Sequence, residues 1–296
     1  MVVRRLRYTG DRAGTYYIDL FRDLSAHERR MIRQKQIAVV HGGVYKDTDG
    51  SVIKINTAPD NWVTKRSINR GFRAWKKMVA KTLKESEGLQ SGKYSDFKIC
   101  LDASMSRATS NHLMAVDSAD VPILMEDAGT GTVGGEWNYS NLISEDPNSA
   151  GTVEDFTLHV VGGNTTSNGI PTEVGLIQSW FDSRPFPDQS GNPVIPADAS
   201  TDPIGNMFDA GDVHDDRVDS IDAENDMPPY NEQAHFGSNR QGGGLQRQSI
   251  AESSTGAGAV VPVHGFTAIC GLLQVEIGAT DSWELILDVD TKGVKF

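Results

Sequence analysis

The sequence predicts an all-β protein with accessory helices, built as a single eight-stranded antiparallel jelly-roll sandwich. Eight segments have the apolar or alternating pattern of β-strands, and short connections alternate with long ones between them. Strands and helices do not alternate regularly, which argues against a parallel α/β sheet. The expected strands are residues 37–45, 51–57, 94–102, 110–116, 155–162, 174–182, 265–277 and 283–290.

Three features of these segments favour strands, namely a turn signal, alternation of apolar and polar residues, and one continuous apolar run. Asp49-Gly50 separates the first two segments and supplies the positive φ that a hairpin turn needs. In the last two segments apolar residues alternate with polar ones, which is typical of half-buried strands. Segment 174–182 is apolar almost throughout, which predicts a strand buried on both faces.

One basic amphipathic helix is expected at residues 59–86, inserted between the second and third strands. Its apolar side chains recur at helical steps of three and four, namely Trp62, Ile68, Phe72, Trp75, Val79 and Leu83. Cations recur at the same steps on another face, namely Arg66, Arg70, Arg73 and Lys77. We expect the apolar stripe to pack on the flank of the sandwich. The basic face is either an ordinary solvated surface or the lining for a polyanion.

Two regions flank or interrupt the predicted strands. Residues 1–36 are expected to form a basic N-terminal arm and a short helix, which a capping-box pattern opens at Ser25. Residues 37–296 are expected to form the jelly-roll domain. Within it, residues 183–258 are acidic and rich in Gly and Pro, which predicts a long surface or interface insertion. This insertion either projects outward or clamps a neighbouring subunit.

The net charge of −12 hides a strong division along the chain. Residues 1–99 carry 21 Lys and Arg against 10 Asp and Glu, a balance of +11. The remaining residues carry 7 basic and 30 acidic side chains, a balance of −23. This division favours a protein whose basic part meets a polyanion and whose acidic part faces water.

Single-stranded nucleic acid is the polyanion that the basic part suits best. Arginines interleaved with tyrosines in the arm are typical of phosphate contact combined with base stacking. A plain basic tail is the competing interpretation. The candidate nucleic-acid-binding residues are Arg4, Arg5, Arg7, Arg29, Arg30, Arg33, Lys35, Arg66, Arg70, Arg73 and Lys77.

No pattern in the sequence indicates catalysis. There is no phosphate-binding Gly-rich loop with its Lys, no Gly-x-Ser-x-Gly elbow and no Cys or His spacing for a metal. We therefore expect no enzymatic activity, no cofactor and no catalytic residue. Asp212, Asp215 and Asp216 are weak candidates for a structural calcium site, with a solvated acidic loop as the favoured alternative. Cys100 and Cys270 are expected to be buried free thiols, with a disulfide left open.

Several segments together resemble capsid proteins of environmental circular Rep-encoding single-stranded DNA viruses. They are DLSAHERRMIRQKQ, NTAPDNWVTKRSINRGFRAWKKM, EWNYSNLISED, DFTLHVVGG, VGLIQSWFDSRPF, ENDMPPYNE, GFTAICGLLQVEI and WELILDVDTKGVKF. The resemblance covers most of the chain and lies in the overall arrangement, not in an invariant motif. The arm departs from it, because it is shorter than in many such proteins and contains Asp11 and Asp19.

The resemblance implies a single jelly roll that self-assembles into an icosahedral shell and encloses circular single-stranded DNA. It also implies assembly inside the host cell, location in the virion and outer loops that meet a host receptor. No run of eighteen apolar residues is present, so no membrane partner is expected.

Two other classes of protein remain open. One is a non-viral single-stranded nucleic-acid-binding protein with an acidic β-sandwich domain. The other is a carbohydrate-binding or hydrolytic β-sandwich, for which Trp137, Trp180 and Trp283 would be the sugar platforms. The strand-like surroundings of these tryptophans favour core positions instead.

Overall fold

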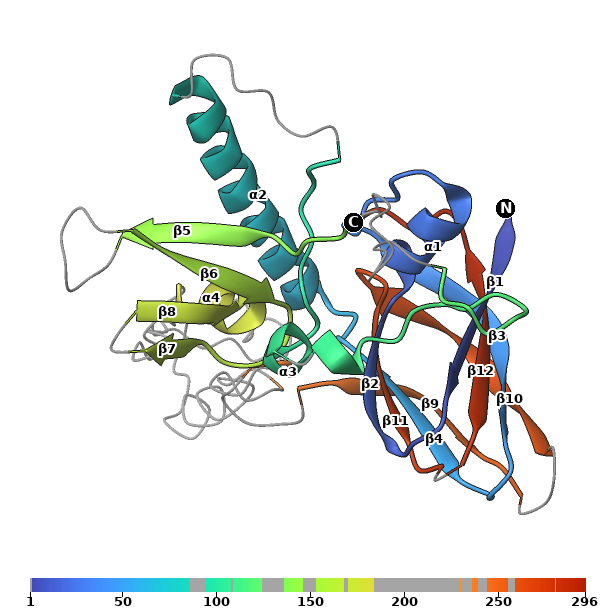
Figure 1. The fold of residues 1–296 in the computed structure, drawn as a ribbon. Coiled ribbons are helices and arrows are strands. Elements are labelled where there is room, and N and C mark those ends of the chain that lie inside the picture. The colour runs from blue at the N-terminus through green and yellow to red at the C-terminus, as the bar shows by residue number, and fades with distance from the viewer. Residues whose placement is uncertain are drawn as a thin grey trace, which may run out of the picture.

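The described part of the chain is mainly β and forms three sheets with few helices (Figure 1). This computed structural model describes residues 2–85, 94–107, 109–123, 136–145, 153–167, 170–183, 229, 236–238, 244–254, 259–279 and 281–296. Two of the sheets face one another, and the third lies to one side of them (Figure 1).

The two facing sheets contain four strands each, and all neighbouring strands are antiparallel. The first sheet has the order β1 (Val3–Gly10), β12 (Trp283–Asp290), β3 (Ile37–Asp47) and β10 (Ala259–Ile269). The second has the order β2 (Gly14–Asp19), β11 (Leu272–Ile277), β4 (Val52–Thr57) and β9 (Gln246–Glu252).

The strand order joins the beginning of the chain to its end. Strand β1 pairs with β12, β2 with β11, β3 with β10, and β4 with β9. The eight strands therefore behave as one long hairpin whose two arms are folded across both sheets. The tip of that hairpin is the connection from β4 to β9, which spans residues 58–245.

One hydrophobic core lies between the two sheets and receives side chains from all eight strands. Because neighbouring residues of a strand point to opposite faces, Leu6 and Tyr8 of β1 enter this core while Arg5 and Arg7 face outward. Other strands contribute Ile18, Val40, Tyr45, Ile55, Ala251, Phe266, Leu273 and Leu285. A core shared in this way is the property of a β-sandwich.

The long connection between β4 and β9 contains the third sheet and most of the helices. The sheet has the order β5 (Asn141–Glu145), β6 (Val153–His159), β8 (Ile170–Gly175) and β7 (Thr165–Ser167). Strands β6 and β8 are parallel, and the other pairs are antiparallel. The helices are α2 (Trp62–Glu85), α3 (Ala103–Arg107), a short 3₁₀ turn (Thr109–Asn111) and α4 (Leu176–Asp182).

Helix α2 packs mainly on α4 and on Phe97, not on the flank of the sandwich as predicted. A Cβ atom at Gly71 would lie 2.7 Å from Leu176 of α4, so this glycine permits the close approach of the two helices. Phe72 stacks on Trp75 and meets Phe97 edge-on, with ring centroids 5.7 Å apart in the second pair. Together with Ile68 of α2, these side chains belong to a second hydrophobic core that reaches the outer side of β2 and β11.

The predictions for three strands were wrong, and a fourth predicted strand lies outside the sandwich. Residues 94–102 follow an irregular path with a single bridge from Cys100 to His159, so the helix does not lie between two sandwich strands in the predicted way. Residues 110–116 are likewise not a strand. In 174–182 the apolar run is mostly the buried helix α4, an ambiguity that periodicity cannot resolve. The segment 155–162 gives β6, which belongs to the third sheet.

Other predicted segments are confirmed or divided. Strands β3, β4 and β12 confirm the predictions for 37–45, 51–57 and 283–290. The segment 265–277 divides into β10 and β11, because Cys270 and Gly271 both have positive φ and reverse the chain.

The N-terminal residues do not form an arm. They supply β1 and β2 of the sandwich. The short helix is α1 (Leu20–Glu28), which Asp19 caps, so the prediction that a capping box opens it at Ser25 was wrong. The described part of 183–258 includes β9, an edge strand of the second sheet. The calcium candidates Asp212, Asp215 and Asp216 lie outside the described residues.

Candidate nucleic-acid interface

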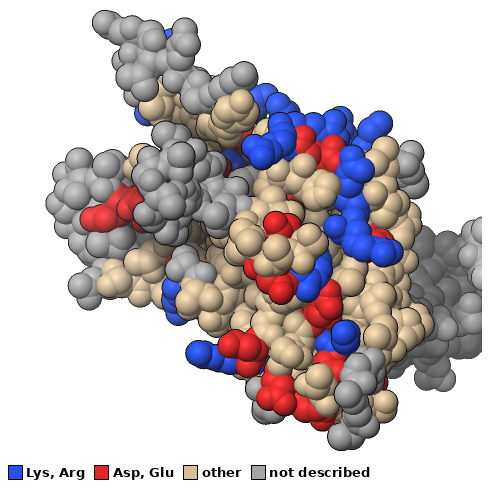
Figure 2. Space-filling model, turned by 45° about the vertical axis from the view of Figure 1, so that its right-hand side comes forward, with Lys and Arg blue, Asp and Glu red and all other residues tan. Residues whose placement is uncertain are grey.

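Basic side chains gather at one end of the sandwich. Helix α1 leaves β2 there, residues 29–36 lead into β3, and residues 291–296 follow β12 (Figure 1). We call this surface the basic end and define it by Arg29, Arg30, Arg33, Lys35, Lys292 and Lys295. Lys35 is half-buried, and the other five are exposed. Lys and Arg side chains accordingly line the upper edge of the molecule in Figure 2.

The opposite end of the sandwich is acidic. It holds the turns from β1 to β2, from β3 to β4 and from β11 to β12, which contain Asp11, Asp49 and Asp281. Acidic side chains are therefore frequent along the lower edge of Figure 2, where few basic ones lie. The sandwich thus has a charge polarity along its strands, which the division of charge along the sequence does not by itself reveal.

Residues 29–36 project their cations because their other side chains are anchored. Arg29 ends α1 in the left-handed conformation, with φ of 52°. The Ser25 hydroxyl accepts a hydrogen bond from the Ile32 amide at 2.9 Å. Buried Gln34 accepts from the Ile99 amide at 2.6 Å and donates to the Ile99 carbonyl at 3.0 Å. With Ile32 and Gln34 held inward, Arg33 between them faces solvent.

Residues 291–296 are held beside this segment by backbone pairing. The Ile37 amide donates to the Val294 carbonyl at 2.7 Å, and the Val294 amide donates back at 2.8 Å. A Cβ atom at Gly293 would lie 2.8 Å from the Ile37 carbonyl oxygen, so a glycine permits this close approach. The pairing brings Lys292 and Lys295 to the basic end.

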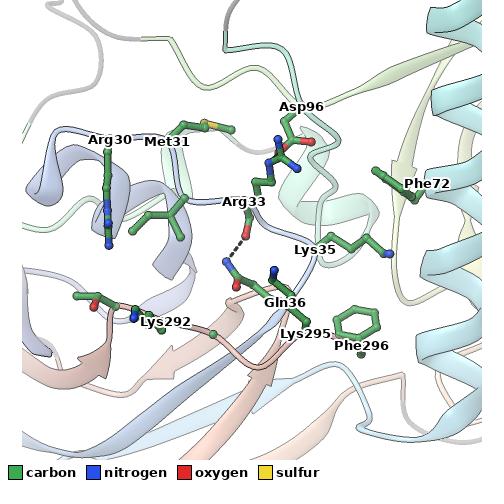
Figure 3. Close-up of a pocket in the computed structure, with 13 residues that line it drawn as sticks. Arg30, Met31, Arg33, Lys35, Gln36, Phe72, Asp96, Lys292, Lys295 and Phe296 are labelled. Carbon is green, nitrogen blue, oxygen red and sulfur yellow. Dashed lines mark hydrogen bonds and ion pairs between the residues drawn. The ribbon is translucent and has the colours of Figure 1, made fainter. Parts of the chain in front are cut away.

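A pocket of about 690 Å³ lies between these two segments and helix α2 (Figure 3). Its charged lining residues are Arg30, Arg33, Lys35, Lys292, Lys295 and Asp96. The ammonium of Lys35 lies 4.5 Å from the centre of the Phe72 ring, a cation–π contact. Arg33 forms an ion pair with Asp96 at 3.4 Å, which draws its guanidinium to the rim. Five cationic side chains thus surround one acidic side chain.

The structure brings some predicted residues together and adds others. Arg30, Arg33 and Lys35 line the pocket, and Arg29 lies beside it on the same segment. Lys292 and Lys295 were missed by the sequence analysis. The only local hint was the two lysines of the segment Thr-Lys-Gly-Val-Lys-Phe. Their position at the basic end could not be predicted, because the Ile37–Val294 pairing joins residues that are distant in the chain.

The three arginines of β1 are already paired with carboxylates, which weakens the prediction that they bind phosphate. Arg4 pairs with Glu28. Arg5 pairs with Asp288 of β12 at 2.8 Å, and this hydrogen bond lowers the pKa of Asp288. Arg7 pairs with both Glu284 and Asp120. These contacts fasten the outward face of β1 to its surroundings.

The predicted cations of α2 form a second basic surface. Arg66, Arg70, Arg73 and Lys77 are all exposed along the helix. Arg70 is also engaged structurally, because its guanidinium donates to the Ser179 carbonyl of α4 at 3.0 Å. None of the four lines the pocket, although Phe72 of the same helix does.

Asp19 connects the basic end to the two cores. Its carboxylate caps α1 by accepting from the amides of Phe21 and Arg22, and it also accepts from Gln34 at 3.0 Å and Trp137 at 2.9 Å. Burial raises the pKa of Asp19 to about 6, although nearby Arg22 opposes this rise. In contrast, burial lowers the pKa of His159 in the third sheet to about 4.

These two pKa shifts predict opposite dependences of stability on pH. Ionised Asp19 disfavours the folded state, so its contribution to the free energy of unfolding rises by about 3 kcal/mol as pH falls from about 6 to about 4. Neutral His159 is required in the folded state, so its contribution falls by about 3 kcal/mol as pH falls from about 6.5 to about 4. In the wild type the two contributions offset each other.

Urea denaturation between pH 4 and pH 7 tests this directly. Asp19→Asn removes the first contribution, so acid should destabilise this variant more steeply than the wild type. His159→Gln removes the second contribution and should be stabilised by acid relative to the wild type. Parallel pH profiles for all three proteins would show that neither group titrates differently on folding.

Three further properties of the described residues concern a disulfide, a metal site and a membrane-spanning helix. Cys100 and Cys270 are buried free thiols, and burial raises the pKa of both. Within the described ranges, no group of three or more His, Cys, Asp or Glu side chains is placed to hold a metal ion. No helix in the part of the chain that the structure describes is long and apolar enough to span a membrane.

No known family, curated protein or solved structure matches this chain. The strand order and the charge polarity of the sandwich are therefore the observations that bear on function.

Proposed function

We propose that this chain is a structural capsid protein whose sandwich is an eight-stranded jelly roll. The observation that carries the proposal is the pairing of β1 with β12, β2 with β11, β3 with β10 and β4 with β9. A jelly roll distributes eight strands over two sheets, and viral capsid domains, lectins and cupins use this arrangement. The fold alone does not choose among these classes.

The charge polarity favours a capsid over the other classes. A shell around single-stranded DNA needs a basic surface on the inside and a soluble surface elsewhere. The basic end, defined above by six cations, is suited to the inside of such a shell. The acidic turns at the other end are suited to the outside, where a host receptor would be met.

The connection between β4 and β9 suits a role in subunit contacts. It carries α2 and the third sheet, and it leaves the sandwich at one corner. Long connections on a rigid sandwich are the usual carriers of binding surfaces. We propose that this connection contacts neighbouring copies in an icosahedral shell, which assembles inside the host cell and becomes the virion. This role requires no catalysis.

Electron microscopy of the expressed full-length protein tests the proposal. We expect closed particles of uniform size, which contain single-stranded DNA that resists nuclease until the particles are opened. Monomers over a wide range of salt and pH would contradict it. Monomers that bind DNA tightly would instead identify the non-viral nucleic-acid-binding alternative.

The carbohydrate-binding alternative receives no support from the tryptophans. Trp283 is 2% exposed and lies in the sandwich core, and Trp180 is also buried. The indole of Trp137 donates to Asp19. A sugar platform needs an exposed ring face, which these side chains do not offer together.

A further inference from the structure

We propose that the pocket at the basic end takes one unpaired nucleotide of single-stranded DNA, with its base against two phenyl rings and the adjoining phosphates on the cations. This inference rests on the proposed function, because it names the ligand of the same surface. The two rings are those of Phe72, from α2, and Phe296, from the C-terminal segment. In Figure 3 both rings lie on the side of α2, while Arg30 and Lys292 lie on the opposite side.

The size of the pocket fits a nucleotide better than a lone phosphate. Its volume of about 690 Å³ lies in the range of sites that enclose small organic molecules, about 300–1,000 Å³. It is bounded by two strand-anchored segments, which fix its walls. The backbone pairing of Ile37 with Val294 ties one wall to the other.

The charge of the pocket is available to a ligand. Arg30, Lys292 and Lys295 form no ion pair with a carboxylate within the described ranges. The only acidic side chain among the lining residues is Asp96, which is paired with Arg33. A phosphodiester chain that passes over the mouth would therefore meet uncompensated positive charge.

The phenyl rings make the pocket selective for unpaired bases. Phe72 is held by Trp75 and Phe97, so its ring is fixed before a ligand arrives. Lys35 lies over the same ring, so Phe72 forms a wall that carries a cation, and the base stacks on the ring of Phe296. A base can stack on a ring only when its faces are free, which is the case in a single strand and not within a duplex.

Salt titrations with short fluorescent oligothymidylate separate the phosphate contacts from the contacts with the base. For single strands, the logarithm of the affinity falls with the logarithm of the salt concentration by about 0.7 for each phosphate contact. We expect full-length Lys292→Gln/Lys295→Gln to lower this slope by about 1.4. The matched control is Lys54→Gln/Arg247→Gln, which removes two cations that face Glu276 on the second sheet and should leave the slope unchanged. An unchanged slope in Lys292→Gln/Lys295→Gln, or an equal loss in the control, overturns the inference.

A second pair of variants tests the stacking of the base. Phe296→Leu keeps an apolar side chain but removes the ring, so the affinity for oligothymidylate should fall about tenfold without a change of slope. Phe296→Tyr keeps the ring and should keep the affinity, which separates stacking from a general loss of folding. Duplex DNA of equal length should bind both variants equally. If Phe296→Leu binds oligothymidylate as the wild type does, the pocket is a plain anion site and the nucleotide assignment is wrong.

Particle formation distinguishes this inference from the proposed function. If the wild type forms shells but the pocket variants bind DNA normally, the pocket assignment fails and the capsid proposal stands. If the wild type forms no shells but its binding follows the pocket variants, the capsid proposal fails and the pocket assignment stands.

Discussion

Shells assembled from a variant with four neutralised cations at the basic end should contain little DNA. The variant is Arg30→Gln/Arg33→Gln/Lys292→Gln/Lys295→Gln. These side chains are exposed, so their replacement costs little folding free energy, and we expect particle yield to be preserved. Loss of four phosphate contacts per subunit should weaken single-strand binding about a hundredfold at physiological salt. Nuclease-protected DNA per particle, measured by absorbance and by gel, checks this result.

The matched control removes the same charge from helix α2. The variant Arg66→Gln/Arg70→Gln/Arg73→Gln/Lys77→Gln neutralises four exposed cations that do not line the pocket. It should also assemble and should lose less DNA, because Arg70 is already engaged with α4. If the pocket variant packages as much DNA as the wild type, the basic end does not face the genome. If the α2 variant loses more DNA, the helix is the main lining.

The sequence predicted those elements whose pattern is local. Strands β3, β4 and β12 have apolar alternation or a turn signal, and the two rows of α2 recur at helical steps. Strand β1 was missed although Leu6 and Tyr8 alternate with Arg5 and Arg7, because the arginines were interpreted as an arm. Strand β9 gives a weak signal, since its inward positions are the small residues Ser249 and Ala251.

Only one of the two segments that form the candidate site could be predicted, again because the sequence shows local patterns alone. The cations of residues 29–36 are evident as a cluster in the sequence, and their outward direction follows from buried Ile32 and Gln34. The contributions of Lys292 and Lys295 depend on a backbone pair between Ile37 and Val294. Such long-range pairing is set by the register of whole sheets, which no local pattern encodes.

Arg22 shows how misleading a local interpretation of charge can be, and its replacement should cause a large loss of stability. It belongs to the basic N-terminal region, yet its side chain is 5% exposed and its ion-pair partner Asp23 is 4% exposed. The guanidinium lies 2.9 Å from Asp23 and also donates to the Leu113 carbonyl. Tyr8 donates to the other oxygen of Asp23 at 2.8 Å. The group therefore joins α1 to β1 and to the loop at residue 113.

Arg22→Met keeps most of the apolar stem but leaves Asp23 buried without its cation. Breaking a buried pair by removing one partner usually costs about 3–5 kcal/mol, so we expect a loss of this size in the free energy of unfolding. Urea denaturation at pH 7 measures it. Arg22→Met/Asp23→Asn removes both charges and should recover a large part of the loss, because Asn still accepts the hydrogen bond from Tyr8.

The double variant decides between two physical causes. If the loss arises from an unpaired buried carboxylate, the double variant is more stable than Arg22→Met alone. If it arises from the hydrogen bond to Leu113 and from packing, the two variants are equally destabilised. We expect the first outcome, since the carboxylates of Asp19 and Asp23 repel each other and Asp23→Asn removes this repulsion once the guanidinium is gone. A loss below about 1 kcal/mol in Arg22→Met would show that water reaches Asp23 and that the pair contributes little.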